Sequence, residues 1–173
     1  MNQSILLSIS GKDRAGIVRD VSEVLLHAHA NIEDSSMAVL RGRFTMMLIV
    51  ELEDSGLSSL KAALAELEQR TGLTVQSQVL SEDEASHIPD EPDCVITVSG
   101  ADKPGIVFAV TDVMAEIGVS VADVSTRARG EVYMMALEAV AGDKLNALQT
   151  KLAGVSDKLS VSIEVHQLDD CVM

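Results

Sequence analysis

The sequence predicts an α+β protein built from two tandem copies of one unit, each with the element order β-α-β-β-α-β. The first observation is an internal repeat, because residues 5–18 (ILLSISGKDRAGIV) align with residues 94–107 (CVITVSGADKPGIV) at an offset of 89. The second is that the hydrophobic pattern changes between strand and helix periodicity in the same order in both copies. The third is a short acidic segment that separates the copies.

The repeat continues well beyond its first motif. Ile32 and Asp34 match Val121 and Asp123 at the same offset. With a gap of one residue, we align Met46-Met47 with Met134-Met135, Leu60 with Leu148, and Leu64 with Leu152. The expected organisation is a first domain over 1–80, a linker over 81–93, a second domain over 94–168 and a tail over 169–173.

In the first copy, an apolar run over residues 4–10 predicts a buried strand. A turn follows at Gly11-Lys12-Asp13, and Asp13 is expected to cap a helix that begins near Ala15. The apolar stripe of this helix consists of Ile17, Val18, Val21, Val24, Leu25 and Ala28.

Two alternating segments, residues 31–40 and 43–53, then predict a β-hairpin whose turn lies at Arg41-Gly42. A second helix is expected to end at Gly72, because glycine favours the left-handed C-cap conformation. Its apolar stripe consists of Leu57, Leu60, Leu64 and Leu67. Residues 73–80 predict the last strand of the copy.

The second copy repeats these elements. They are expected as a strand over 94–99, a helix over 104–117, strands over 119–128 and 131–140, a helix over 143–153 and a strand over 158–168. This order is that of the ferredoxin-like fold, in which one antiparallel sheet carries both helices on one face. The other face or the sheet edge needs a cover, so we expect a homodimer.

The linker over residues 81–93 (SEDEASHIPDEPD) contains six Asp or Glu residues and no Lys or Arg. Such a segment cannot bury apolar surface, so we expect it to be solvated and partly extended.

Charge and composition exclude several function classes. The chain has 13 Lys and Arg against 27 Asp and Glu, a net charge of −14, which argues against direct nucleic-acid binding and against anionic membranes. Two cysteines and no recognisable signal peptide predict a cytoplasmic protein.

His27 and His29, two positions apart on a helix, cannot converge on one metal ion. Without a P-loop, a nucleophile elbow or a paired-acid motif in the sequence, we expect neither catalysis nor a cofactor.

The strand–turn–helix corner carries the strongest local signal. Gly11 and Gly100 can take positive φ without a Cβ penalty. Gly16 and Gly105 are expected to lie in the first helical turn, where glycine is otherwise unfavourable by roughly 1 kcal/mol. One explanation is that a small carboxylate ligand approaches the free N–H groups at the positive helix end. The other is that these glycines let the helix pack tightly on the next strand. The residues alone leave both open.

This corner, the element order and the following Asn31-Ile32-Glu33-Asp34 resemble the ACT domain, a small regulatory module that binds amino acids. The resemblance implies a ligand between two domains, at the corner of one and the start of the second strand of the other. In copy one it implies the residues Asp13, Arg14, Ala15, Gly16, Ile17, Val18, Asn31 and Ile32. In copy two it implies Asp102, Lys103, Pro104, Gly105, Ile106, Val107, Ser120 and Val121.

Within that family, residues 31–40 (NIEDSSMAVL) followed by Phe44-Thr45 resemble the glycine cleavage system transcriptional repressors. The resemblance implies a non-enzymatic sensor of an amino acid, glycine or serine, that acts through a DNA-binding activator protein. The alternatives are a regulatory subunit of an amino-acid metabolic enzyme and a structural assembly module.

Overall fold

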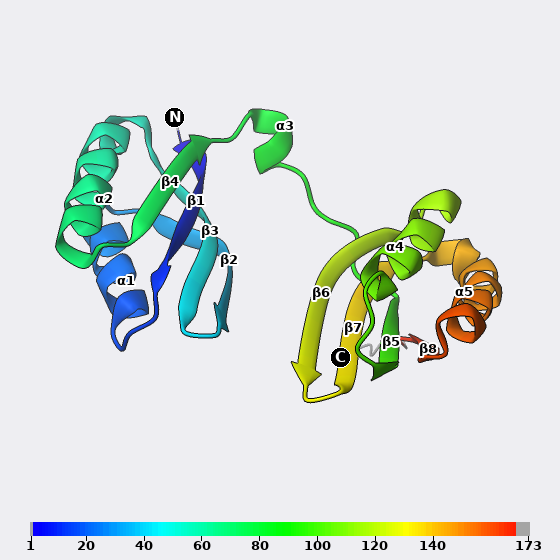
Figure 1. Cartoon of the computed structure of the whole chain (residues 1–173). Coiled ribbons are helices and arrows are strands. Elements are labelled where there is room, and N and C mark those ends of the chain that lie inside the picture. The colour runs from blue at the N-terminus through cyan, green and yellow to red at the C-terminus, as the bar shows by residue number, and fades with distance from the viewer. Residues whose placement is uncertain (1, 169–173) are drawn as a thin grey trace. The chain divides into compact units, whose positions relative to one another are not determined.

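The computed structural model describes residues 2–168, and the chain divides into two compact units at the Ile88–Pro89 bond (Figure 1). Each unit has its own sheet, helices and hydrophobic core. The expected tail, residues 169–173, lies outside the described part of the chain. Within residues 2–168, none of the helices combines the length and hydrophobicity needed to cross a bilayer.

Unit 1 is a four-stranded antiparallel sheet with two helices on one face (Figure 1). Its strands lie in the order β2-β3-β1-β4, and every neighbouring pair is antiparallel. The elements are β1 (Asn2–Lys12), α1 (Ile17–His27), β2 (Asn31–Leu40), β3 (Arg43–Glu53), α2 (Leu57–Thr71) and β4 (Thr74–Val79). The predicted fold class is thereby confirmed for the first copy.

Unit 2 repeats this architecture with the strand order β6-β7-β5-β8. Its elements are β5 (Cys94–Ala101), α4 (Ile106–Ile117), β6 (Ser120–Arg129), β7 (Val132–Val140), α5 (Leu145–Leu159) and β8 (Ser162–Gln167). Each unit also has one turn of 3-10 helix before its second helix, Asp54–Gly56 and Gly142–Lys144. The tandem duplication of the whole fold is therefore confirmed.

The core of unit 1 lies between the sheet and its helices, because alternate strand residues face the helices. On β1 the buried side chains are those of Ile5, Leu7 and Ile9. The helices contribute Ile17, Val21 and Leu25 from α1, and Leu60, Leu64 and Leu67 from α2. Val18, expected in the α1 stripe, is instead 41% exposed and lines a hollow at the start of the helix.

The core of unit 2 has the same plan, and Leu148 and Leu152 of α5 are fully buried in it. One polar contact lies at its margin, where the Tyr133 hydroxyl donates to Met135 Sδ at 3.5 Å. Burial raises the pKa of Tyr133, so its hydroxyl stays protonated at neutral pH.

The strand registers correct the predicted alignment of the two copies. Ile9 pairs with Met46 in unit 1, and the equivalent Val98 pairs with Met135 in unit 2. Met46 thus corresponds to Met135, and the match of the methionine pairs is wrong by one residue. The gap falls between the third strand and the second helix, because α2 begins seven residues after Val50, whereas α5 begins six residues after the equivalent Ala139. In each pair one methionine is buried, and its neighbour faces the opposite side and is half-exposed.

The helix α5 is longer than the sequence predicts. It continues through Gly154 to Leu159, and the expected strand over 158–168 is reduced to Ser162–Gln167. A glycine inside a helix costs roughly 1 kcal/mol relative to alanine. The packing of Val155 and Leu159 against the core offsets that cost. The helix ends at Ser160, which has a φ of 52°.

The segment between the units contains one turn of helix, α3 (Glu82–Ala85), where the sequence predicts partly extended chain. Ser81 and Glu84 form a capping box that stabilises this turn. The Ser81 hydroxyl accepts from the Glu84 N–H at 3.3 Å, and the Glu84 carboxylate accepts from the Ser81 N–H at 2.8 Å. Local hydrogen bonding thus orders a segment whose composition offers no apolar packing.

Asp93, at the end of the expected linker, is bound to unit 2. Its N–H donates to the Ala139 carbonyl at 3.0 Å. Its carboxylate accepts from the N–H groups of Ala141 at 2.8 Å and Gly142 at 2.6 Å. The hydrogen bond from Ala141 is the main reason that the pKa of Asp93 is lowered. Hydrogen bonds therefore fix the last residue of the expected linker against the sheet of unit 2.

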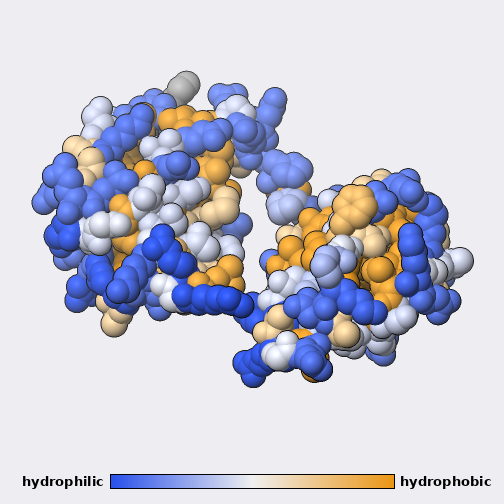
Figure 2. All heavy atoms as spheres, in the orientation of Figure 1, coloured by the Kyte–Doolittle hydropathy of each residue, from blue (hydrophilic) through white to orange (hydrophobic). Residues whose placement is uncertain are grey.

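The strands β2 and β6 lie at the edges of their sheets, and all ten residues of each are exposed. Their exposed apolar side chains include Ile32, Met37, Val39, Leu40, Val121 and Val124. Hydrophobic side chains are visible among hydrophilic ones on the surface of both units (Figure 2). Each unit thus leaves one long sheet edge uncovered.

Candidate functional site

In unit 1 the chain turns from β1 into α1 at residues 13–16. Gly16 is the N-cap of α1, with φ 88° and ψ 2°, and the helix begins at Ile17. The prediction that Asp13 caps the helix is wrong, because none of the described side chains accepts a hydrogen bond at this helix end. The Asp13 N–H instead donates to the Gly42 carbonyl at 2.9 Å, which ties the corner to the β2–β3 turn.

Unit 2 has the same backbone conformation at its corner. Gly105 is the N-cap of α4, with φ 92° and ψ −2°. The Asp102 N–H donates to the Glu131 carbonyl at 3.1 Å, in the turn between β6 and β7. The duplication therefore extends to the detailed geometry of the corner, although the surrounding side chains differ.

Gly16 and Gly105 are required by backbone conformation and not by tight packing. A β-carbon in the left-handed region costs roughly 1–2 kcal/mol. A Cβ placed on Gly105 would meet none of the described atoms within 4 Å, apart from its chain neighbours, and one on Gly16 would lie 3.7 Å from Arg19 Nη2. Tight packing on the next strand is thus excluded as the explanation. The space beside both helix ends is open.

Gly11 and Gly100 have the packing role instead. Neither is in the left-handed region, so neither uses the positive φ that glycine allows. A Cβ on Gly11 would lie 2.6 Å from Leu73 Cδ2, and one on Gly100 would lie 2.8 Å from Val161 Cγ1. Both glycines therefore allow the residue before the last strand of each unit to pack against the first strand.

Both helix ends present N–H groups without helical partners. The first hydrogen bond of α1 runs from the Asp20 N–H to the Gly16 carbonyl at 2.9 Å, and that of α4 from Ala109 to Gly105 at 2.9 Å. The N–H groups of the first three residues of each helix precede these bonds and have no carbonyl four residues back within the helix. Such a helix end, following a left-handed residue, suits an anion such as a carboxylate.

Unit 1 adds a charged triad, Arg14, Arg19 and Asp20, to this corner. The Asp20 side chain is 7% exposed, and its carboxylate oxygens lie 2.6 Å from Arg14 Nη2 and 2.6 Å from Arg19 Nη2. The hydrogen bonds from Arg19 and then Arg14 lower the pKa of Asp20 to about 2. The triad carries one more positive than negative group, and the carboxylate of Asp13 lines the same corner.

The corner of unit 2 lacks this arrangement, because Lys103, Phe108 and Ala109 occupy the three equivalent positions. The Lys103 ammonium donates to the Leu159 carbonyl at 2.9 Å. The Phe108 side chain is 71% exposed. The two corners thus share a backbone but differ in charge.

A hollow accompanies each corner. In unit 1 it measures about 190 Å³, and its lining includes Asp13, both arginines, Met37 and Phe44. In unit 2 it measures about 430 Å³ and is lined by Lys103, Phe108 and Tyr133 among others. Both hollows are open at the surface of their own unit.

The other predicted site residues, 31–32 in unit 1 and 120–121 in unit 2, begin β2 and β6. Asn31 pairs with Glu51, whereas the corner adjoins the far end of the sheet, where Lys12 pairs with Arg43. A ten-residue strand spans roughly 30 Å. One unit therefore does not bring its corner and its β2 start together. A β-bulge after Ile32, repeated after Val121, marks these strand starts.

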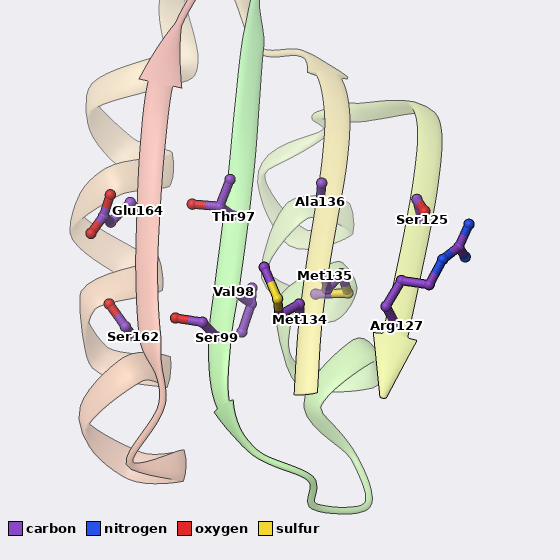
Figure 3. Close-up of a pocket in the computed structure, with 10 residues that line it drawn as sticks. All are labelled: Thr97, Val98, Ser99, Ser125, Arg127, Met134, Met135, Ala136, Ser162 and Glu164. Carbon is purple, nitrogen blue, oxygen red and sulfur yellow. The ribbon is translucent and has the colours of Figure 1, made fainter. Parts of the chain in front are cut away.

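A hollow that the sequence did not predict, of about 370 Å³, lies on the sheet of unit 2. Figure 3 shows Thr97, Ser99, Ser162 and Glu164 directed to the face opposite the helices, whereas Met135 points toward them. The four polar side chains come from the adjacent strands β5 and β8. Alternation along the strands places these polar groups on the face without helices, where the exposed side chain of Met134 also lines the hollow.

The described residues contain neither a metal-binding cluster nor a reactive thiol. Among residues 2–168, no group of three or more His, Cys, Asp or Glu side chains is arranged to hold a metal ion. Cys94 is buried, and burial raises the pKa of its thiol to about 11. That thiol is therefore protonated at neutral pH and is a poor nucleophile.

A family model of the ACT domain matches the chain twice, over residues 3–78 and 93–166. The chain belongs to the ACT domain family. Each match spans one complete β-α-β-β-α-β unit, so the protein is a tandem of two ACT domains. Domains of this family are regulatory modules, and the resemblance noted from the corner motif is thereby confirmed.

Individual ACT relatives match part of the chain. The UPF0237 protein YjhC of Lactococcus lactis is 33% identical over 73 residues, which are 42% of this chain and 84% of YjhC. A UPF0237 protein of Pyrobaculum aerophilum is 38% identical over 72 residues, or 40% of this chain and 80% of that protein. These relatives correspond in length to a single ACT domain.

Two solved structures resemble the whole tandem. A protein of unknown function from Galdieria sulphuraria is 29% identical, with a TM-score of 0.77, and the match covers 98% of this chain and all of that one. A protein assigned provisionally as a glycine cleavage system transcriptional repressor is 22% identical, with a TM-score of 0.78, and the match covers 98% of this chain and 99% of that one. The second likeness shows a shared tandem fold.

Proposed function

We propose that this protein is a non-enzymatic sensor that binds a small amino acid at the strand–helix corner of its ACT domains and regulates glycine cleavage genes through a protein partner. The observation that carries the proposal is the open helix end behind a left-handed glycine, present in both units. It offers N–H groups and a positive dipole to a carboxylate.

The ligand would be a small amino acid such as glycine or serine. Its carboxylate would take the N–H groups at the start of α1, and the hollow of about 190 Å³ in unit 1 favours a ligand with a small side chain. Asn31 can both donate and accept hydrogen bonds, which suits the ammonium and carboxylate of an amino acid. Because Asn31 lies at the opposite end of the sheet from the corner, a second copy of the chain would supply it, which makes the sensor a homodimer.

The transcriptional role is proposed on two grounds. The chain shares its tandem fold with the provisionally assigned glycine cleavage repressor. Its net charge of −14 disfavours contact with DNA, so regulation would pass through a DNA-binding protein. Ligand binding would then change the affinity for that partner, and a coupling of ~1–3 kcal/mol would suffice.

Thermal unfolding against the twenty common amino acids at millimolar concentration tests the ligand. We expect a selective rise in Tm of several degrees with glycine or serine, since a ligand at about 100 times its Kd stabilises a protein by about 2.7 kcal/mol. Asn31→Ala should abolish the rise in Tm. The matched control is Ser120→Ala, which changes the equivalent position of unit 2. A wild-type protein that no amino acid stabilises would contradict the sensor.

The partner is tested by affinity capture from cell extract, with and without the stabilising amino acid. Ligand-dependent recovery of a DNA-binding protein would support transcriptional regulation. Recovery of an amino-acid metabolic enzyme would instead favour a regulatory subunit.

A further inference from the structure

We propose that the helix-free face of the unit 2 sheet stacks against the same face of a second copy of the chain, with Arg127 of each copy pairing with Glu164 of the other. The occupant is a second copy because the charges of this face are complementary to themselves. The face shares no lining residue with the hollow at the unit 2 corner. The stacking is therefore independent of whether the corners bind an amino acid.

The strand registers arrange this face in rows that cross the sheet from β6 to β8. Two neighbouring rows are Arg127-Met134-Ser99-Ser162 and Ser125-Ala136-Thr97-Glu164. Figure 3 shows Arg127 on β6 at one edge of the sheet and Glu164 on β8 at the other. The Glu164 side chain is 63% exposed, and Arg127 is exposed as well. Opposite charges thus lie on opposite edges, in rows roughly 7 Å apart along the strands.

These charges select one way of stacking two copies. A two-fold axis parallel to the strands, midway between β7 and β5, places β6 of each copy over β8 of the other. Arg127 then lies one row from Glu164 of the second copy, within reach of two long side chains, and the contact forms twice. An axis across the strands would place each edge strand over itself, and so bring together either the two arginines or the two glutamates.

The same axis accommodates the next row of charges. Asp123 and Glu138 lie directly opposite each other on β6 and β7, where like charges repel. His166 lies in the same row on β8, with its Nε2 3.2 Å from Glu164 Oε2. Stacking places His166 over Asp123 of the second copy, where an imidazole N–H can donate to the carboxylate.

The middle of the face is suited to close packing. Met134 is 58% exposed, and the axis places it over the small Ser99 of the second copy. In the next row Ala136 meets Thr97. A large side chain opposite a small one lets two sheets interdigitate at the usual spacing of about 10 Å. Stacking would therefore bury an apolar side chain that unit 2 alone leaves in water.

The equivalent face of unit 1 lacks this charge pattern. The registers place Ala38, Gln76 and Gln78 where unit 2 has Arg127, Glu164 and His166. Charge complementarity therefore belongs to unit 2, and unit 1 supplies a matched control position within the same chain.

Sedimentation equilibrium of the full chain tests the stacking. We expect a self-association step that weakens as salt is added. Arg127→Glu or Glu164→Arg should raise the Kd of this step about tenfold or more, because each places two like-charged pairs across the axis. The two reversals combined in one chain should return the Kd to within about threefold of wild type. Gln76→Arg, the equivalent change in unit 1, should leave it unchanged.

Circular dichroism and thermal unfolding check that each variant is folded. A step that neither reversal weakens, or that the double reversal fails to restore, would overturn the proposal. A chain that stays monomeric would overturn it too, and would leave this face to a different partner. Stabilisation by an amino acid should survive the reversals. An Asn31-dependent dimer that the reversals do not affect would support the sensor and refute the stacking.

Discussion

Arg19 Nη2 lies 2.6 Å from Asp20 Oδ1, although the two residues are consecutive in α1. Consecutive helical residues point in different directions, so the long arginine side chain must fold back across the helix end to reach its neighbour. The pair is formed by a buried carboxylate and an exposed guanidinium, with Arg14 completing the triad from the other side. A cation is thereby held at a helix end that has no side-chain cap among the described residues.

Asp20→Asn should lower the free energy of unfolding at neutral pH, and the difference from wild type should shrink in acid. The pKa of Asp20 is lowered to about 2 by the two arginines, against about 3.9 in an unfolded chain. A depressed carboxyl pKa contributes stability above the unfolded value, and this contribution is lost as the pH falls toward the folded value. Urea unfolding of both proteins at neutral pH and near pH 3 measures this. A difference that does not vary with pH would contradict the prediction.

Gly105→Ala should destabilise the protein by roughly 1–2 kcal/mol, because it places a β-carbon in the left-handed region. Gly105→Asn should cost less, since asparagine tolerates that conformation. Gly154→Ala is the matched control. It lies inside α5 with room for a methyl group, and should stabilise the protein by about 0.5–1 kcal/mol. Denaturant unfolding compares the three. A Gly105→Ala variant as stable as wild type would contradict this prediction, because it would show that the backbone at residue 105 accommodates a β-carbon without cost.

Gly100→Ala should destabilise the protein by about 1–3 kcal/mol through overpacking. Its new Cβ would lie 2.8 Å from Val161 Cγ1 and 3.2 Å from the Val161 Cα. Gly11→Ala should cost less, because its nearest contact is the end of the Leu73 side chain, with the Leu73 backbone 3.4 Å away. The comparison is made by urea unfolding, and the reverse order of cost would refute this account of the two glycines.

Asp93→Ala should destabilise the protein by about 1–3 kcal/mol, because the N–H groups of Ala141 and Gly142 lose a charged acceptor. Asp93→Asn keeps one carbonyl acceptor and should cost less. Since the pKa of Asp93 is lowered in the folded state, this contribution is present at neutral pH and lost in acid. Hydrogen exchange at the Ala141 amide provides a local readout. Unchanged protection there in Asp93→Ala would contradict the anchoring role.

The element order and the positions of most turns were predictable, because both depend on neighbouring residues. The leucine stripe of α2, the hairpin turn at Arg41-Gly42 and the C-cap at Gly72 all lie where the sequence predicts them. The end of α5 was not predictable from Gly154, since its continuation depends on core packing that periodicity does not reveal.

The candidate site was predicted in part. The corner motif identified residues 13–18, and their role in binding stays a prediction. Arg19 and Asp20 were missed, although an Arg-Asp pair beside the apolar Ile17 and Val18 was a visible signal. The sequence gives no distances or burial, so it could not show that the buried carboxylate of Asp20 is paired with both Arg14 and Arg19.

By itself, the sequence determined the duplication, the α+β class and the acidic character of this protein, since repeats, periodicity and charge are properties of short segments. The tertiary structure alone decided which glycines need positive φ, because the same Gly-rich corner could satisfy either close packing or a left-handed turn. It also decided that Arg14, Arg19 and Asp20 form an ion-paired cluster at the corner of unit 1. An ion pair depends on the distance and burial of side chains, and those are set by the elements that pack around them.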